Sequence, residues 1–168
     1  PEFGFVNLDK NPDVHPDVVH DLECAPLPFP SDSFDFVLGS HLFEHIRNFV
    51  PLMEELCRIL RPGGHLLAVT PYAFSDSAWE NPHHVRCFSE NTWGYFDQDL
   101  YRGNHAGNGA TEGYKGNFKL VQVILIPEQR FLNDQEIEFK KRHWRNVIQE
   151  VHAVLRAEKP EPAMEGEP

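Results

Sequence analysis

The sequence predicts an α/β domain in which a mostly parallel sheet is flanked by helices. Residues 34–39 and 65–70 form two mainly apolar runs, and such runs are typical of strands buried on both faces. Between them, apolar residues recur at helical spacing from Phe49 to Leu60. A strand, a helix and a strand in this order build the crossover that joins parallel strands, and such sheets bind ligands at the carboxyl ends of their strands.

Two shorter strands are expected ahead of this crossover. Residues 5–9 form an apolar run that ends in Asp9, and residues 18–22 form a second run that carries Asp21. The segment Asn11-Pro12-Asp13 between them is a turn signal. The first part of the chain therefore predicts two strands that each place an acid at or near the carboxyl end.

The second half of the chain is expected to hold two loops, a strand and a closing helix. Residues 73–88 and the glycine-rich residues 103–117 lack apolar rhythm and are expected to form loops, the second of them mobile, whereas residues 118–126 predict a strand. Asn133 with Glu136 resembles a capping box. The helix that it opens would present one apolar face made of Trp144, Val147, Ile148, Val151, Val154 and Leu155.

Composition limits the classes of function. The 168 residues suggest one domain, expected over residues 1–158, with a disordered acidic Pro/Glu tail at 159–168. A net charge of −11 argues against a broad nucleic-acid surface. Three widely spaced cysteines indicate neither a disulfide framework nor a cysteine-rich zinc site, which favours a cytoplasmic protein. No apolar run approaches the roughly 20 residues that a membrane span needs.

The two strand-end acids suggest nucleotide binding. An Asp at the end of a strand can accept two hydrogen bonds from a ribose diol, and Asp9 has that placement. Asp21 could accept from an adenine amino group while Leu22 packs on the ring. Each acid taken alone also fits a turn or capping carboxylate, because Asp favours turns through local hydrogen bonds.

The order of these segments resembles the class I S-adenosylmethionine (SAM)-dependent methyltransferases, in particular a small type-11-like methyltransferase domain. The resemblance rests on Asn7-Leu8-Asp9, on the strand Phe34-Asp35-Phe36-Val37-Leu38, on the Phe43-Glu44-His45-Ile46 segment and on the Arg61-Pro62-Gly63-Gly64 turn. It covers about residues 5–72, with a weaker likeness from 81 to 97. It implies a Rossmann-like sheet and a transfer of the SAM methyl group to a nucleophile.

The resemblance also implies a cofactor site. Asp9, with Lys10 beside it, would hold the ribose, and Asp21 with Leu22 would contact the adenine. Gly39 and Ser40 would lie beside the methionine end of SAM. The family's first strand and glycine-rich loop would precede Pro1, so the sequence predicts an N-terminally truncated domain that lacks this loop.

The acceptor side is expected in the loops that follow the two buried strands. His41 ends the first of these strands, and His84 and Arg86 belong to a histidine-rich loop after the second. An Arg there can bind a carboxylate or phosphate, and a His can take a proton from a hydroxyl or amine. The sequence favours a small-molecule acceptor over a nucleic acid, identifies no specific acceptor and leaves the oligomeric state open.

A zinc hydrolase is one alternative. His41-Leu42-Phe43-Glu44-His45 fits H-x-x-E-H, the inverted zincin pattern, in which two histidines on one helix face share a zinc ion and the Glu acts as general base. That site needs a helix here, whereas residues 34–40 place His41 at the junction of a strand and a loop. No metal ligand is therefore assigned.

Two further alternatives share the predicted fold. The domain could be a non-catalytic binding or regulatory module that keeps a methyltransferase-like architecture without the glycine loop. A nicotinamide-dependent oxidoreductase would also use Asp9 at the ribose, although the Arg61-Pro62-Gly63-Gly64 turn does not favour it.

Overall fold

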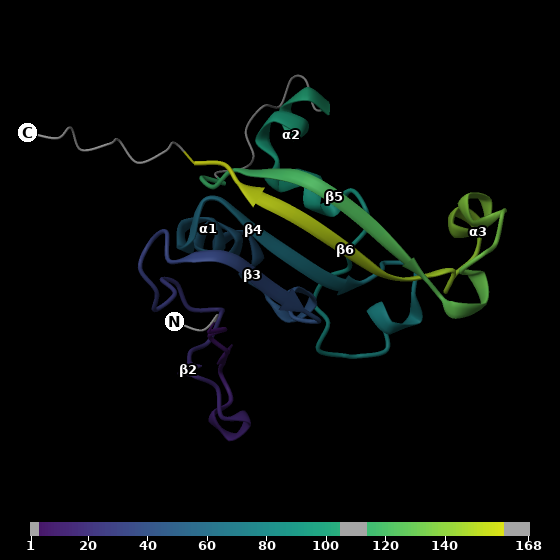
Figure 1. The fold of residues 1–168 in the computed structure, drawn as a ribbon. Coiled ribbons are helices and arrows are strands. Elements are labelled where there is room, and N and C mark those ends of the chain that lie inside the picture. Colours follow the sequence, from purple (N-terminus) through teal and green to yellow (C-terminus); the bar gives the residue numbers. More distant parts are fainter. Residues whose placement is uncertain (1–3, 105–113, 160–168) are drawn as a thin grey trace, which may run out of the picture.

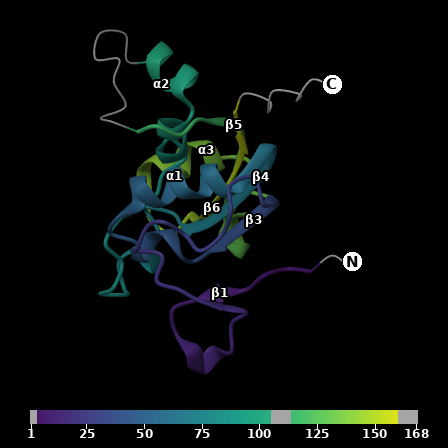
Figure 2. The same ribbon diagram turned by 90° about the vertical axis from the view of Figure 1, so that its left-hand side faces the viewer.

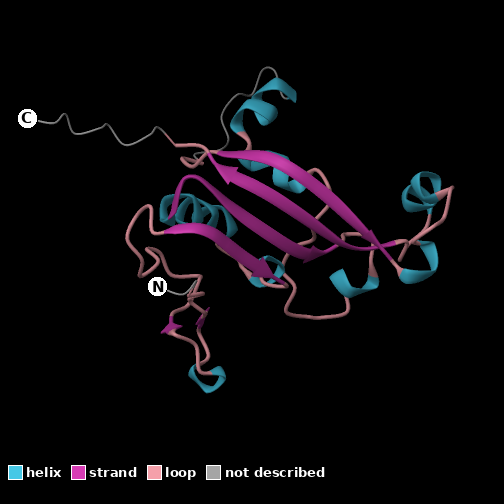
Figure 3. Ribbon diagram, viewed as in Figure 1, coloured by secondary structure: helices cyan, strands magenta, loops and turns pink. Residues whose placement is uncertain are grey.

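The computed structural model describes residues 4–104 and 114–159 and confirms the predicted α/β fold class. In these residues a four-stranded sheet has the order β3-β4-β6-β5, and a separate two-stranded sheet pairs β1 with β2 (Figures 1, 2 and 3). The strand bounds are Leu8–Asp9 (β1), Val18–Val19 (β2), Phe34–Ser40 (β3), Leu60–Pro71 (β4), Phe118–Pro127 (β5) and Ile148–Ala157 (β6).

The helices are short, and many of them are 3-10 turns. The α-helices are Phe49–Ile59 (α1), Gln98–Asn104 (α2) and Ile137–His143 (α3). The 3-10 helices are Pro12–Val14 (η1), Phe43–His45 (η2), Asp76–Ala78 (η3), Thr92–Phe96 (η4) and Gln129–Phe131 (η5). In the part of the chain that the structure describes, no helix combines the length and apolar character that a membrane crossing needs.

The predicted crossover from β3 through α1 to β4 is present. β3 and β4 are parallel, in a register that runs from Phe36 opposite His65 to Ser40 opposite Val69. α1 buries one apolar stripe against β4, made of Phe49, Leu52, Met53, Leu56, Cys57 and Ile59. Parallel pairing puts the carboxyl ends of β3 and β4 at the same edge of the sheet, where the loops after both strands begin.

The closing helix predicted from the capping-box signal is wrong at both ends: Glu136 rather than Asn133 precedes the first helical residue and makes no side-chain cap hydrogen bond, and the helix does not continue beyond residue 143. α3 ends at His143, Trp144 is 53% exposed, and residues from Ile148 onward form strand β6. β6 lies between β4 and β5 and is antiparallel to both, so the four-stranded sheet is mixed rather than mostly parallel as expected. Burial alternates along β6, with Val151, Ala153, Leu155 and Ala157 inside, because successive side chains of a strand point to opposite faces of the sheet.

One face of the sheet is better covered than the other. On the face that carries α1 and η4, five aromatic side chains, each at most 4% exposed, pack into one cluster: Phe43, Phe49, Phe88, Trp93 and Phe96. On the opposite face Phe36 and Leu38 of β3 are 44% and 56% exposed. The expectation that β3 is buried on both faces is therefore wrong, and among the described strands β3 lies at an edge.

Two predicted features fall largely outside the described residues. The glycine-rich loop expected at 103–117 includes residues 105–113, and the tail expected at 159–168 includes residues 160–168. Lys159 itself is described, and its Nζ donates to Asp32 Oδ1 at 2.6 Å, to the Arg58 carbonyl at 2.8 Å and to the Leu60 carbonyl. The three cysteines are unpaired.

Candidate functional site

Asp9 and Asp21 lie at the same edge of the β1–β2 pair. The strands are parallel, with Asp9 opposite Val19. β2 ends at Val19 rather than at residue 22 as predicted, so Asp21 lies two residues beyond the end of the strand. Asp9 Oδ1 accepts from the Asn11 N–H at 2.8 Å, and Asp21 Oδ1 accepts from the Glu23 N–H at 3.0 Å. Among the described residues neither Oδ2 atom has a hydrogen-bond partner, so each carboxylate keeps an oxygen for a ligand hydroxyl or amine.

Glu23 fixes the segment that carries Asp21 against the start of α1. Its two carboxylate oxygens accept from the backbone N–H groups of Arg47, at 2.7 Å, and Asn48, at 2.9 Å. The Asn48 amide donates in return to the Glu23 carbonyl at 3.1 Å. Leu22, next to Asp21, packs against the core. The free N–H groups at a helix start attract a carboxylate, but nothing in the spacing along the chain pointed to Glu23.

Gly39 and Ser40 lie at the carboxyl end of β3. Gly39 is buried, and a Cβ placed on it would overlap the ring of Phe43. The glycine is therefore required by the packing of Phe43 beneath the loop that follows β3. Ser40 is exposed, and Lys10, the other predicted neighbour of the cofactor, is exposed as well.

We expect Gly39→Ala to lower the free energy of unfolding by about 1–3 kcal/mol, since the added methyl group must displace the buried Phe43 ring. Urea unfolding measures the effect. Ser40→Ala, one position along the same strand, is the matched control and should change stability by less than about 0.5 kcal/mol because Ser40 is exposed. Equal losses in the two variants would contradict this account of Gly39.

His41 stands between two carboxylates at the end of β3. Its backbone has a left-handed conformation, with φ 48°, and its N–H donates to the Val69 carbonyl at 2.9 Å. Nε2 lies 3.2 Å from Glu150 Oε1, and Nδ1 lies 3.7 Å from Glu44 Oε1. The second Glu150 oxygen contacts His152 Nε2 at 2.7 Å. Glu150 and His152 were missed because the sequence pattern assigned them to a helix.

Arg86 braces the loop before α1. Its Nε donates to the Ile46 carbonyl at 3.0 Å, its Nη2 donates to the Arg47 carbonyl at 2.9 Å, and the guanidinium lies 4.7 Å from the centre of the Phe49 ring. Burial lowers the pKa of Arg86. It also lines a hollow of about 780 Å³ between α1 and η4. Two of its donors are therefore already used within the protein, which leaves fewer for a substrate anion.

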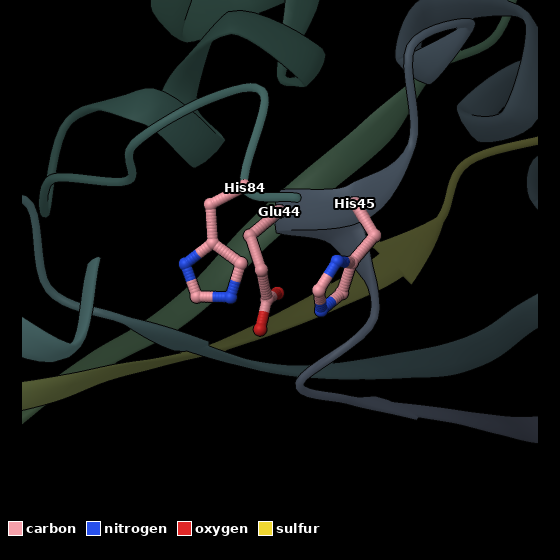
Figure 4. A group of neighbouring side chains, drawn as sticks. All are labelled: Glu44, His45 and His84. Atoms are coloured by element: carbon pink, nitrogen blue, oxygen red, sulfur yellow. The ribbon is translucent and has the colours of Figure 1, made fainter. Parts of the chain in front are cut away.

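Glu44, His45 and His84 come together from two loops (Figure 4). Glu44 and His45 belong to η2 after β3, and His84 lies in the loop after β4, held there by a hydrogen bond from the Val85 N–H to the Glu44 carbonyl at 2.8 Å. One ligand atom from each side chain lies within 4.8 Å of the others. The H-x-x-E-H segment is not the single helix that an inverted zincin needs, because β3 ends at Ser40 and η2 is a short 3-10 turn.

Comparison with known proteins shows that part of the chain is similar to methyltransferases. Residues 6–68 match the family described as "Methyltransferase domain". A protein of Mycolicibacterium smegmatis named "Probable S-adenosylmethionine-dependent methyltransferase" is 36% identical over 66 residues, which are 37% of this chain and 26% of that protein. The chain spans about a quarter of the length of the curated relatives that it matches.

Solved structures show the same fold at low sequence identity. A SAM-dependent methyltransferase from Archaeoglobus fulgidus superposes with a TM-score of 0.59 at 14% identity, and the alignment covers 89% of this chain and 74% of that protein's chain. A second, from Mesorhizobium loti, has a TM-score of 0.52 at 16% identity, and the alignment covers 89% of this chain and 78% of that protein's chain. Residues 6–68 are therefore similar to the methyltransferase domain family, and the chain shares the fold of class I SAM-dependent methyltransferases, enzymes whose methyl donor is SAM.

Proposed function

We propose that this protein transfers the methyl group of SAM to a small-molecule acceptor. The observation that carries the proposal is the pair of strand-end carboxylates, Asp9 and Asp21. They lie at one edge of parallel strands, and each has an oxygen without a partner among the described residues. Carboxylates in this position suit the ribose hydroxyls and the adenine amino group of the donor. Bound SAM supplies a methyl group on a positively charged sulfur, which is a good leaving group.

In this proposal, different residues of the chain contact the ribose, the adenine and the methionine end of the donor. Asp9 accepts from the ribose hydroxyls with Lys10 beside it, while Asp21 accepts from the adenine amino group and Leu22 packs on the ring. Gly39 and Ser40, at the carboxyl end of β3, border the methionine end. Glu23 keeps the Asp21 turn beside the loop that follows β3. Such positioning of donor and acceptor can supply much of the rate of a displacement reaction.

The acceptor side of the proposal rests on the loops after β3 and β4. His41 is half exposed and contacts Glu150, so it can orient an acceptor hydroxyl or amine and take its proton. Arg86 is proposed to help shape the acceptor pocket, because it lines the hollow beside α1. The net charge of −11 favours a small acceptor over a polyanion. A cytoplasmic location is part of this proposal and is supported by the three unpaired cysteines.

The first test is binding of S-adenosylhomocysteine, the product form of the donor, measured by isothermal titration. We expect the chain to bind it in the micromolar range and Asp9→Ala to weaken binding by about tenfold or more, since one charged hydrogen-bond acceptor is lost.

Asp13→Ala is the matched control, because Asp13 is an exposed acid in the neighbouring turn η1 and should leave the affinity unchanged. No binding at millimolar ligand, or equal affinities for Asp9→Ala and the unaltered chain, would contradict the proposed site. Tight binding with no methyl transfer to any tested hydroxyl, amine or thiol acceptor would support the non-catalytic module instead.

A further inference from the structure

We infer that Glu44, His45 and His84 form a binding site for a divalent transition-metal ion, with Zn²⁺ as the representative ion. One ligand atom from each of the three side chains lies within 4.8 Å of the other two. Zinc and similar ions are bound by imidazole nitrogens and carboxylate oxygens at about 2.0–2.2 Å, so bound ligand atoms lie roughly 3–3.6 Å apart. Small side-chain rotations would close the present cluster around an ion.

The burial of Glu44 is the strongest reason to expect a cation. Glu44 is 1% exposed, and within the described residues neither of its carboxylate oxygens has a hydrogen-bond partner. A buried ionised carboxylate is unfavourable unless it is paired, hydrogen-bonded or bound to a metal. The nearest His41 nitrogen is 3.7 Å away, too far for a hydrogen bond. An ion between Glu44 and the two histidines would compensate both oxygens.

The orientation of His84 suits a metal ligand. Its Nδ1 lies 3.1 Å from the carbonyl oxygen of Ala78, and a carbonyl only accepts, so Nδ1 carries the proton. The lone pair is therefore on Nε2, the nitrogen on the Glu44 side of the ring in Figure 4. Metal-binding histidines commonly donate their other N–H to a carbonyl or carboxylate in this way, which fixes the ring and its tautomer.

The second imidazole completes a mixed nitrogen and oxygen donor set. The rings of His45 and His84 lie with their centres 4.7 Å apart and nearly at right angles, and the Glu44 carboxylate lies between them in Figure 4. Two imidazoles and one carboxylate suit zinc, iron or manganese better than calcium or magnesium. The site would join η2 to the loop after β4. Because His84 belongs to this donor set, we assign it to metal binding rather than to proton transfer.

Zinc binding by the purified chain tests the inference. After removal of metal with a chelator, Zn²⁺ is titrated in competition with a chromophoric chelator. We expect one ion per chain with a Kd below about 1 μM, weakened at least about 100-fold by Glu44→Gln and by His84→Ala. His83→Ala is the matched control, because His83 is exposed and adjacent to His84 and should leave the affinity unchanged.

Two further readouts separate metal binding from folding defects. At a hundredfold excess over Kd, Zn²⁺ should raise the Tm by about 5–10 °C in the unaltered chain and in His83→Ala, but not in Glu44→Gln. Glu44→Gln removes an uncompensated buried charge, so without metal it should be at least as stable as the parent. Co²⁺ should give visible absorption typical of nitrogen and oxygen coordination, which His84→Gln abolishes.

The absence of one-to-one Zn²⁺ binding would overturn the inference, as would equal weakening by His83→Ala and His84→Ala. These titrations need no SAM or S-adenosylhomocysteine. A failure of the metal site is therefore distinguishable from a failure of the proposed methyl-donor site.

Discussion

Replacing Trp93 with alanine is expected to lower the free energy of unfolding by about 3–5 kcal/mol. Trp93 is fully buried and stacks on Phe88 with ring centres 5.1 Å apart. Its ring also meets Phe43 and Phe49 edge to face, at 5.5 Å and 5.8 Å between centres. Removal of the indole leaves a cavity that three large rings cannot fill without moving.

Trp93→Phe is the control that separates the loss of volume from the loss of the indole N–H. Trp93 Nε1 is buried and has no hydrogen-bond partner within the described residues, so phenylalanine removes an unpaired donor as well as part of the ring. We expect this variant to lose less than about 2 kcal/mol. Urea unfolding of both variants gives the comparison, and losses of similar size would indicate that the cluster does not depend on close packing around this ring.

The aromatic cluster also connects stability to the candidate site. Phe43 immediately precedes Glu44, and Phe88 lies four residues after His84. Both rings pack on Trp93, so the loops that follow β3 and β4 rest on one buried layer. Because the proposed metal ligands come from these two loops, the position of the ligands depends on packing beneath them rather than on their own backbone segments alone.

The elements that the sequence predicts well are those whose local signals agree with their surroundings. The helix from Phe49 and the strands predicted at 34–39 and 65–70 each have a clear period. The turn predicted at Gly63-Gly64 is wrong, because both glycines lie within β4, where the register against β3 shifts. Residues 148–157 lack such a clear local signal, because their valines, leucine and alanines fit an amphipathic helix as well as an alternating strand. Their structure is decided by hydrogen bonds to β4 and β5, which lie far away in the sequence.

The same limit applies to the candidate site. Asp9, Asp21 and His41 stand at strand ends, where a pattern of apolar residues followed by a polar one predicts them. Glu23 and Glu150 have no such signal, since each acts through a contact with a residue 25 to 109 positions away along the chain. A carboxylate that caps a distant helix or pairs with a distant imidazole becomes visible only when the fold is known.

Asp97→Ala should also lower the free energy of unfolding by about 3–5 kcal/mol, because it leaves two backbone donors without their acceptor and removes the partner of Lys119, which is 47% exposed. Asp97 is 2% exposed and lies between η4 and α2. Its Oδ1 accepts from the Leu100 N–H at 3.0 Å, and its Oδ2 accepts from the Leu120 N–H at 3.0 Å. Lys119 Nζ lies 3.3 Å from Oδ2. One side chain thus ties α2 to β5.

The effect should depend on pH in a defined direction. Burial acts to raise the pKa of Asp97, but the hydrogen bonds from Leu100 and Leu120 and the charge of Lys119 outweigh it and hold the pKa below its usual range. A carboxyl group whose pKa is depressed in the folded state stabilises that state above the unfolded pKa of about 3.9, and the contribution is lost as pH falls through the folded pKa. The stability difference between the parent and Asp97→Asn should therefore be constant near pH 7 and shrink below about pH 4.

Urea unfolding at a series of pH values measures this dependence. Asp99→Ala is the matched control, because Asp99 is an exposed acid in the first turn of α2 and should change stability by less than about 1 kcal/mol. A difference between the parent and Asp97→Asn that grows toward low pH would mean that burial, which disfavours the charged form, dominates at this carboxylate. The hydrogen bonds to Leu100 and Leu120 would then contribute less than their geometry indicates.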